Sequence, residues 1–198
     1  MMTKLMAGAI AAGSIIALTG CGSATNASQQ KSPAIPSPAA SPIPPVQKAP
    51  RDVAAMARRP CELLTPQQAA SFRLDLPPEQ EDGLFGTQQC TWLSKNREYT
   101  TVRSVYVSMF TNNLTLEAVY GRRQGLPFFE MANISGYPAI VSRTNASLPG
   151  CDIDVKPAER QSVSIIYRAI EFKNNPQQAC EVGKQVAAAV VMNFPLKS

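Results

Sequence analysis

Four cysteines, Cys61, Cys90, Cys151 and Cys180, limit most strongly how this chain can fold. Four cysteines allow three pairings. The spacing from Cys61 to Cys90 equals the spacing from Cys151 to Cys180, which favours these two local pairs. A disulfide that closes a loop of this size adds about 3–4 kcal/mol of stability if its effect is mainly on the unfolded chain. The sequence therefore predicts a folded domain with two disulfides.

A metal site is the alternative use of such cysteines. The sequence contains no Cys-x-x-Cys pair and no histidine, and these are the usual ligands of structural zinc. An even number of cysteines also argues against a free reactive thiol. We therefore expect structural disulfides, no metal and no cofactor.

The fifth cysteine, Cys21, belongs to a separate segment at the start of the chain. Lys4 precedes an apolar run, Leu5 to Leu18, that is shorter than the roughly 20 residues of a membrane span. Such a run is typical of a secretory signal peptide. It ends in the tetrapeptide Leu-Thr-Gly-Cys, which resembles the bacterial lipobox. The alternative is an ordinary secretory leader followed by a chance cysteine.

The lipobox resemblance implies that residues 1–20 are a signal peptide and that Cys21 receives lipid. Two or three acyl chains hold a protein stably on a membrane. The implied location is the extracytoplasmic face of a bacterial cell membrane, where disulfides persist.

Residues 21–52 are expected to be this acylated cysteine followed by a disordered tether. The segment 22–50 is rich in Pro, Ser and Ala and has no aromatic residue, so it cannot bury enough apolar surface to fold. Proline-rich chains extend by about 3.1 Å per residue, which would lift the next domain clear of lipid headgroups. The prolines could alternatively form a docking motif for a partner.

Charge and composition exclude several function classes. The formal net charge is +5, but the cations are scattered and no basic run exceeds two residues, so nucleic-acid binding is not expected. The absence of histidine removes the Ser-His-Asp triad and the Cys-His dyad. An enzyme built on this chain would lack the commonest general base.

Capping residues mark two helices in the domain predicted at residues 53–198. Thr65, Pro66 and Gln68 have the spacing of a capping box with proline in the first turn. Asn175 and Pro176 begin a second helix in the same way, and its apolar stripe continues to Phe194. A further helix is expected at residues 114–124, with Asn113 as its cap.

Alternating apolar and polar residues predict about five strands. They are expected at residues 89–94, 101–110 and 139–143 and in the segments that begin at Cys151 and Gln161. The order is α-β-β-α-β-β-β-α. Short connections favour antiparallel pairing, and helices must cover a sheet face. The predicted fold class is α+β, with the local cysteine pairs attaching each terminal helix to the sheet.

Several short motifs support this arrangement. The motifs are Cys61-Glu62-Leu63-Leu64-Thr65, Cys90-Thr91-Trp92 and Gly136-Tyr137-Pro138-Ala139, followed by Cys151, Pro176 and Ala179-Cys180. Their order, from about Arg59 to Pro195, resembles a family of actinobacterial lipoproteins of unknown function. The resemblance implies structural disulfides and an envelope location, and it implies no activity.

Three aromatic residues are candidates for a binding surface. Phe128 and Phe129 are adjacent and cannot both point inward in an extended chain, so one is expected at the surface, facing a partner or lipid. The alternative is a loop that folds back over the core. Tyr137, in a predicted turn, could line a cleft. Trp92 is expected to pack on a disulfide in the core.

Acidic residues offer a weaker candidate site. Asp152 and Asp154 share one face of a predicted strand and, with Glu159, could bind a cation. The segment lacks the glycine turn and the terminal glutamate of a calcium loop. We therefore expect an exposed strand edge here, and a solvated acidic loop at residues 79–82.

The function expected from these features is a non-catalytic binding or accessory module of the cell envelope. It would attach to the membrane by its lipid and bind an envelope protein, a wall polymer or an apolar ligand. The alternative is an envelope hydrolase that uses two carboxylates, drawn from Glu62, Asp75, Asp152, Asp154 and Glu159. Glycosidases place such a pair about 5 Å or about 6.5–9.5 Å apart. A structural or inhibitory lipoprotein without a pocket is a third hypothesis.

Metabolic labelling with a fatty-acid analogue tests the anchor. We expect the wild-type protein to carry the label and the Cys21→Ser variant to carry none, because the hydroxyl cannot form the thioether to lipid. Gel fluorescence after coupling a dye to the analogue measures both. Labelling that survives the substitution would exclude Cys21 as the lipid attachment site.

Overall fold

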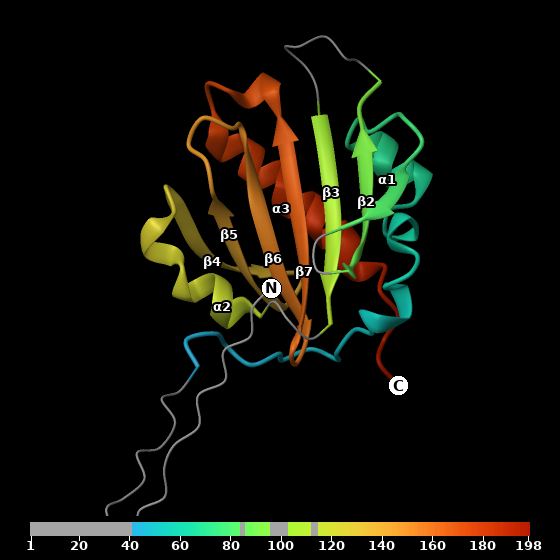
Figure 1. The fold of residues 1–198 in the computed structure, drawn as a ribbon, viewed down its shortest axis with the longest axis vertical. Coiled ribbons are helices and arrows are strands. Elements are labelled where there is room, and N and C mark those ends of the chain that lie inside the picture. Colours follow the sequence, from blue (N-terminus) through green and yellow to red (C-terminus); the bar gives the residue numbers. More distant parts are fainter. Residues whose placement is uncertain (1–40, 84–85, 96–102, 112–114) are drawn as a thin grey trace, which may run out of the picture. The chain divides into compact units, whose positions relative to one another are not determined.

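A seven-stranded antiparallel sheet forms the centre of the domain (Figure 1). The computed structural model describes residues 41–83, 86–95, 103–111 and 115–198. The spatial order of the strands is β1-β2-β3-β7-β6-β5-β4. The strands are β1 (Glu79–Asp82), β2 (Gln88–Leu93), β3 (Arg103–Phe110), β4 (Phe128–Ile134), β5 (Tyr137–Arg143), β6 (Gly150–Ala158) and β7 (Gln161–Ala169). Two meanders, β1–β3 and β4–β7, therefore join where β3 pairs with β7.

Three α-helices and several 3₁₀ turns complete the domain. They are α1 (Pro66–Ser71), α2 (Leu116–Gly121), α3 (Pro176–Met192), η1 (Ala54–Met56), η2 (Pro60–Leu63), η4 (Arg123–Gly125) and η5 (Ile170–Phe172). Over the described part of the chain, no helix has both the length and the apolar content needed to cross a membrane.

The α+β class with two disulfides is confirmed, but the predicted count of about five strands is wrong. The prediction omitted β1, whose four residues are all exposed, and β4, whose residues are mostly half-buried. Both are edge strands and pair with one neighbour only. Edge strands carry charge and lack a strong apolar period, so periodicity does not reveal them. The segment 79–82, expected to be an acidic loop, is strand β1.

Two of the three predicted helix N-caps are confirmed. The Thr65 hydroxyl accepts a hydrogen bond from the Gln68 amide at 3.2 Å, which confirms the capping box of α1. Asn175 caps α3 by accepting from the Gln178 amide at 3.2 Å. The cap of α2 is Thr115, whose side chain accepts from the Ala118 amide, so the predicted cap Asn113 is wrong. Residue 113 itself lies outside the described residues.

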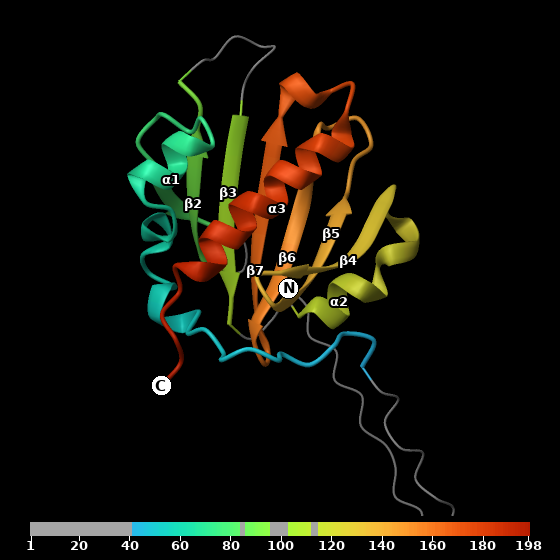
Figure 2. The ribbon, with the colours of Figure 1, turned by 180° about the vertical axis from the view of Figure 1, so that it is seen from behind.

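One face of the sheet carries the main core beneath α3 (Figure 2). The buried residues on this face include Cys90, Trp92, Val105, Val107, Ile153, Val155, Val163, Ile165 and Tyr167. Helix α3 approaches closely at Gly183, where an added Cβ would lie 2.9 Å from Ile153 Cδ1 and 3.2 Å from Tyr167 Cβ. A larger residue there would push the helix away from the sheet.

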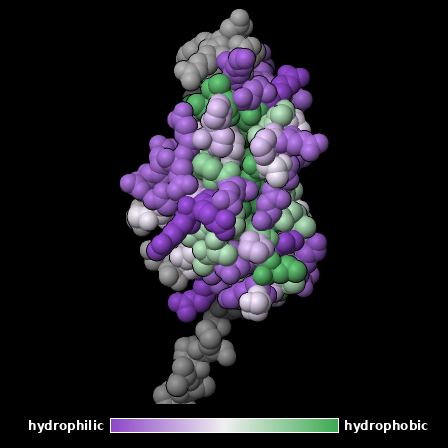
Figure 3. Space-filling model, turned by 90° about the vertical axis from the view of Figure 1, so that its right-hand side faces the viewer, coloured by the Kyte–Doolittle hydropathy of each residue, from purple (hydrophilic) through white to green (hydrophobic). Residues whose placement is uncertain are grey.

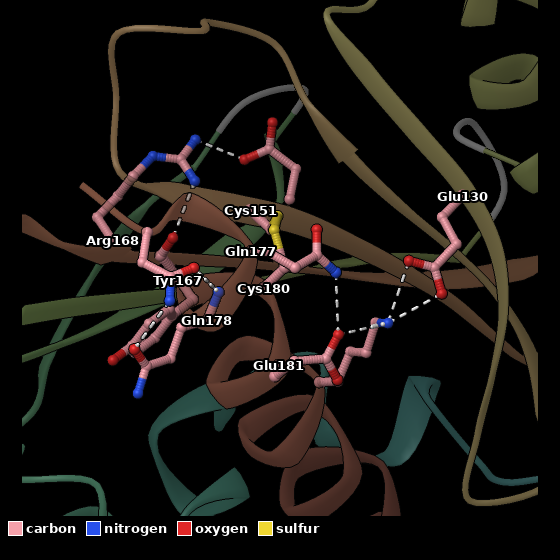
Figure 4. Close-up of a disulfide and its surroundings, with 11 residues drawn as sticks. Glu130, Cys151, Tyr167, Arg168, Gln177, Gln178, Cys180 and Glu181 are labelled. Atoms are coloured by element: carbon pink, nitrogen blue, oxygen red, sulfur yellow. Dashed lines mark hydrogen bonds and ion pairs between the residues drawn. A yellow bond between two sulfur atoms is a disulfide. The ribbon is translucent and has the colours of Figure 1, made fainter. Parts of the chain in front are cut away.

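Disulfides join both terminal helical segments to the sheet. Cys61 in η2 is bonded to Cys90 in β2, and Cys151 in β6 is bonded to Cys180 in α3. Figure 4 shows the second bond between the strand and the helix. These are the two local pairs that the equal spacings favour.

Residues 41–52 pack along one end of the sheet as a strap, rather than forming part of a free tether. Packed residues therefore occur before residue 53, the domain boundary expected from composition. Ile43 is 3% exposed, and the Tyr137 hydroxyl donates to the Ala49 carbonyl at 2.8 Å. The Arg51 Nε in turn donates to the Tyr137 hydroxyl at 3.0 Å. Proline-rich composition hid this docking, because only a few strap side chains are apolar.

The strap is tested by replacing its buried side chain. Ile43→Ala should lower the free energy of unfolding by about 2–5 kcal/mol, because it leaves a cavity beside α2 and β5. Urea denaturation measures this. The control is Met131→Ala, which removes a 38% exposed side chain and should cost much less. If both substitutions lowered the free energy of unfolding by the same small amount, the strap would not contribute to the stability of the fold.

Candidate binding groove

A groove crosses the face of the sheet that α3 does not cover. It consists of two cavities of about 430 and 420 Å³ that share Gln89, Ile166 and Arg168 in their walls. Helix α2 lines one side of the larger cavity through Val119, and the Pro149 segment lines the smaller one. Each volume lies in the range of small-molecule sites.

Asp154 is the most unusual side chain in the groove. It lies on β6, lines the larger cavity and is only 5% exposed. Burial is the main cause that raises the pKa of its carboxyl, the charge of Asp152 acts in the same direction, and the resulting pKa is about 6. A hydrogen bond with Ser164 and the positive charge of Arg122 act in the opposite direction on this pKa. The groove therefore contains a carboxyl that changes charge slightly below neutral pH.

Asp152 lies two residues earlier on the same face of β6 and has a different environment. Its Oδ1 accepts from the Arg168 guanidinium at 2.5 Å. Its Oδ2 accepts from the Thr144 hydroxyl at 3.1 Å. Both carboxylate oxygens thus have partners, and the adjacent positive charge offsets that of Asp152.

Two serine hydroxyls in the groove have no partner among the residues that the structure describes. Ser142 on β5 is 2% exposed and lines the larger cavity. Ser104 on β3 is 8% exposed and lines the smaller one. Nearly all buried polar groups in proteins form hydrogen bonds. Hydroxyls that lack a protein partner but face a cavity are therefore available to a ligand.

A second, more apolar pocket lies beside the Cys61–Cys90 disulfide. It measures about 670 Å³ between α1 and β2, and its walls include Leu64, Pro77 and Trp92. Figure 3, which views the molecule from the side of α1, shows hydrophobic residues among hydrophilic ones on this side. Trp92 is 1% exposed, so it lies in the core as expected.

The structure does not gather the three predicted aromatic residues on one surface. Phe128 packs against the main core, while Phe129 lies on the other face of β4 against Tyr120, with ring centroids 5.8 Å apart. Tyr137 is 1% exposed and holds the strap. Neither phenylalanine is fully exposed, because each face of β4 is covered by a different part of the core.

The carboxylates considered for a hydrolase do not lie in one site. Asp152 and Asp154 share the groove, whereas Glu62 and Asp75 line the apolar pocket. Glu159 forms an ion pair with Lys156 at 2.9 Å. The expected exposed edge at Asp152 and Asp154 is wrong, because β6 lies between β5 and β7 and both side chains are buried.

No metal cluster occurs within the described ranges, in the sense of three or more His, Cys, Asp or Glu side chains placed to hold an ion. A separate result concerns the groove residues that were not predicted from the sequence, which are Arg122, Arg168, Ser142 and Ser104. The polar positions that alternate along β3, β6 and β7 were the available signal, since they mark a second sheet face.

Comparison with known proteins identifies a family. Residues 16–193 match the model of a protein family of unknown function, DUF3558. The chain belongs to this family. The unknown-function family implied by the cysteine and tryptophan motifs is therefore confirmed. No curated protein and no solved structure matches the chain.

Asp154 makes the stability of this DUF3558 protein depend on pH. Because the folded-state pKa is about 6 instead of 3.8, the folded chain binds the proton more tightly than the unfolded chain. Stability from this group is present below pH 3.8 and falls as pH rises to about 6, by about 3 kcal/mol in total.

Asp154→Asn should remove the loss of stability that Asp154 causes as pH rises. The variant should therefore be more stable than wild type at pH 7.5, and the difference between them should shrink as pH falls from 6 to 4. Urea denaturation across that range measures it. Ser164→Ala is the companion variant: it removes a hydrogen bond that lowers the pKa, so the loss should extend to higher pH. Parallel pH curves for wild type and Asp154→Asn would show that Asp154 titrates normally.

Proposed function

We propose that the protein is a non-catalytic binding module, held on the extracytoplasmic face of the membrane by lipid on Cys21. The ligand site in this proposal is the groove on the sheet face opposite α3. The observation that carries it concerns two largely buried residues, Ser142 and Ser104, whose hydroxyls line the two cavities and have no hydrogen-bond partner among the described residues. Sites on strands hold polar groups more rigidly than sites on loops.

The cost of Asp154 supports the same site. A buried carboxylate lowers stability near neutral pH, and an asparagine would fit the same position without that charge. Residues that lower stability are often retained for function. The apolar pocket beside α1 is also lined by polar residues, Glu62, Thr65 and Asp75, but all three are at least partly exposed, unlike Asp154 in the groove.

The arrangement of Asp152 favours binding over catalysis. In a two-carboxylate hydrolase one carboxylate must attack the substrate or activate water. Here both oxygens of Asp152 accept hydrogen bonds, from Arg168 and Thr144. The hydrolase alternative rests on one observation, the raised pKa of Asp154 in a groove that also contains the carboxylate of Asp152. Product formation from a bound ligand, lost in Asp154→Asn, would support it.

The anchor and the strap define how far the groove can be from lipid. Docking of residues 41–52 leaves residues 22–39 as the spacer between Cys21 and the folded unit. A proline-rich spacer of this length reaches about 55 Å when fully extended. That reach would allow the groove to contact both lipid headgroups and material beyond them.

Photo-crosslinking in the intact bacterium tests the binding function. A photoreactive amino acid at Gln89, in the wall shared by both cavities, should give a reproducible adduct on membranes. The same amino acid at Gln177, an exposed residue of α3, is the matched control and should give none. Mass spectrometry of the protein detects the adduct. Equal labelling at both positions, or none at Gln89, would contradict a ligand site in the groove.

A further inference from the structure

We infer that the groove recognises a neutral, hydroxyl-rich ligand, namely a short saccharide chain. This inference rests on the proposed binding function and adds the chemical class of the ligand. The source of the saccharide can be a free glycan or the headgroup of a glycolipid, since both present the same chemistry to the groove.

Charge balance is the first reason. The groove walls contain two carboxylates, Asp152 and Asp154, and two guanidinium groups, Arg122 and Arg168. Asp152 and Arg168 form an ion pair, and Arg122 lies close enough to act on the charge of Asp154. A groove whose positive and negative charges are equal in number offers no net attraction to an ionic ligand.

Hydrogen-bond chemistry is the second reason. Ser142 and Ser104 present hydroxyls that can both donate and accept, and neither has a partner in the described part of the protein. Sugar hydroxyls also donate and accept, so each can pair with a serine in either direction. Asp154 adds an acceptor, while Phe110 and Ile166 supply apolar surface for the C–H faces of a sugar ring.

The position of the groove on the sheet favours a saccharide over a peptide. One common way for an extended peptide to bind is to pair its backbone with a free strand edge. This groove lies over β2, β3, β7, β6 and β5, whose backbones are already paired on both sides. A peptide backbone would find only side chains there and would leave many of its amide groups without partners.

The shape of the groove indicates more than one sugar unit. The two cavities lie side by side, and Gln89, Ile166 and Arg168 belong to the walls of both. Ser142 lies in one cavity and Ser104 in the other. An occupant that uses both hydroxyls must extend across Arg168, as a chain of linked sugars does.

The test titrates the acylated full-length protein in phosphatidylcholine nanodiscs. The probes are a panel of neutral tetrasaccharides, a neutral tetrapeptide, and nanodiscs that also contain digalactosyl diacylglycerol. Isothermal titration calorimetry measures the soluble probes, and chemical-shift changes of groove residues measure the glycolipid. Binding of a soluble tetrasaccharide indicates a free glycan, and binding to the glycolipid alone indicates a membrane source.

The decisive variants are Ser142→Ala and Ser104→Ala. Each should weaken saccharide binding about threefold to tenfold, the effect of one neutral hydrogen bond. Neither should lower the unfolding temperature, because neither hydroxyl has a partner in the described protein. Ser71→Ala makes the same change on α1, outside the groove, and should leave binding unchanged.

Several results would overturn the inference. These are saccharide binding that is unaffected by both groove variants, binding of the tetrapeptide without any saccharide, and no saccharide binding at all. If no saccharide binds but the Gln89 photo-adduct forms, the ligand class is wrong and the binding function stands. If neither is seen, both proposals are wrong.

Discussion

The alternation of side chains along β6 is the constraint on which the rest of the structure depends. Cys151, Ile153 and Val155 point into the main core, where the first is bonded to α3 and the second lies under Gly183. Because successive side chains of a strand face opposite sides, Asp152 and Asp154 must lie on the other face. The core and the groove are thus two faces of one strand, and neither can shift register without displacing the other.

The groove stays open because the helices cover the two faces unequally. The long helix α3 lies across one face, whereas the six-residue α2 covers only the end of the other, beside β5 and β6. The uncovered strands carry serines, a glutamine and paired charges instead of a continuous apolar layer. A second helix would bury little apolar surface on a sheet face of this composition. The same polar side chains can instead form hydrogen bonds with a ligand.

Much of the fold could be predicted from the sequence, and the reasons differ between elements. Caps at Thr65 and Asn175 and the apolar stripe of α3 are local signals, and they located both helices. The edge strands β1 and β4 could not be found, because pairing with one neighbour leaves no apolar period to detect. The groove was missed for another reason. The sequence predicts that Asp152 and Asp154 lie on an exposed strand edge, because it does not reveal the order of the strands. In the structure β6 lies between β5 and β7.

The small second core connects the strap to the groove. Ile43 from the strap packs with Leu116 and Val119 of α2 and with Ile140 of β5. Val119 also lines the larger cavity, and Arg122 at the end of the same helix acts on Asp154. The segment that leads to the proposed lipid anchor is therefore seated on the helix that forms the groove wall. By packing against α2, the strap supports the helix that forms this wall, so the strap and the groove wall belong to one packed cluster.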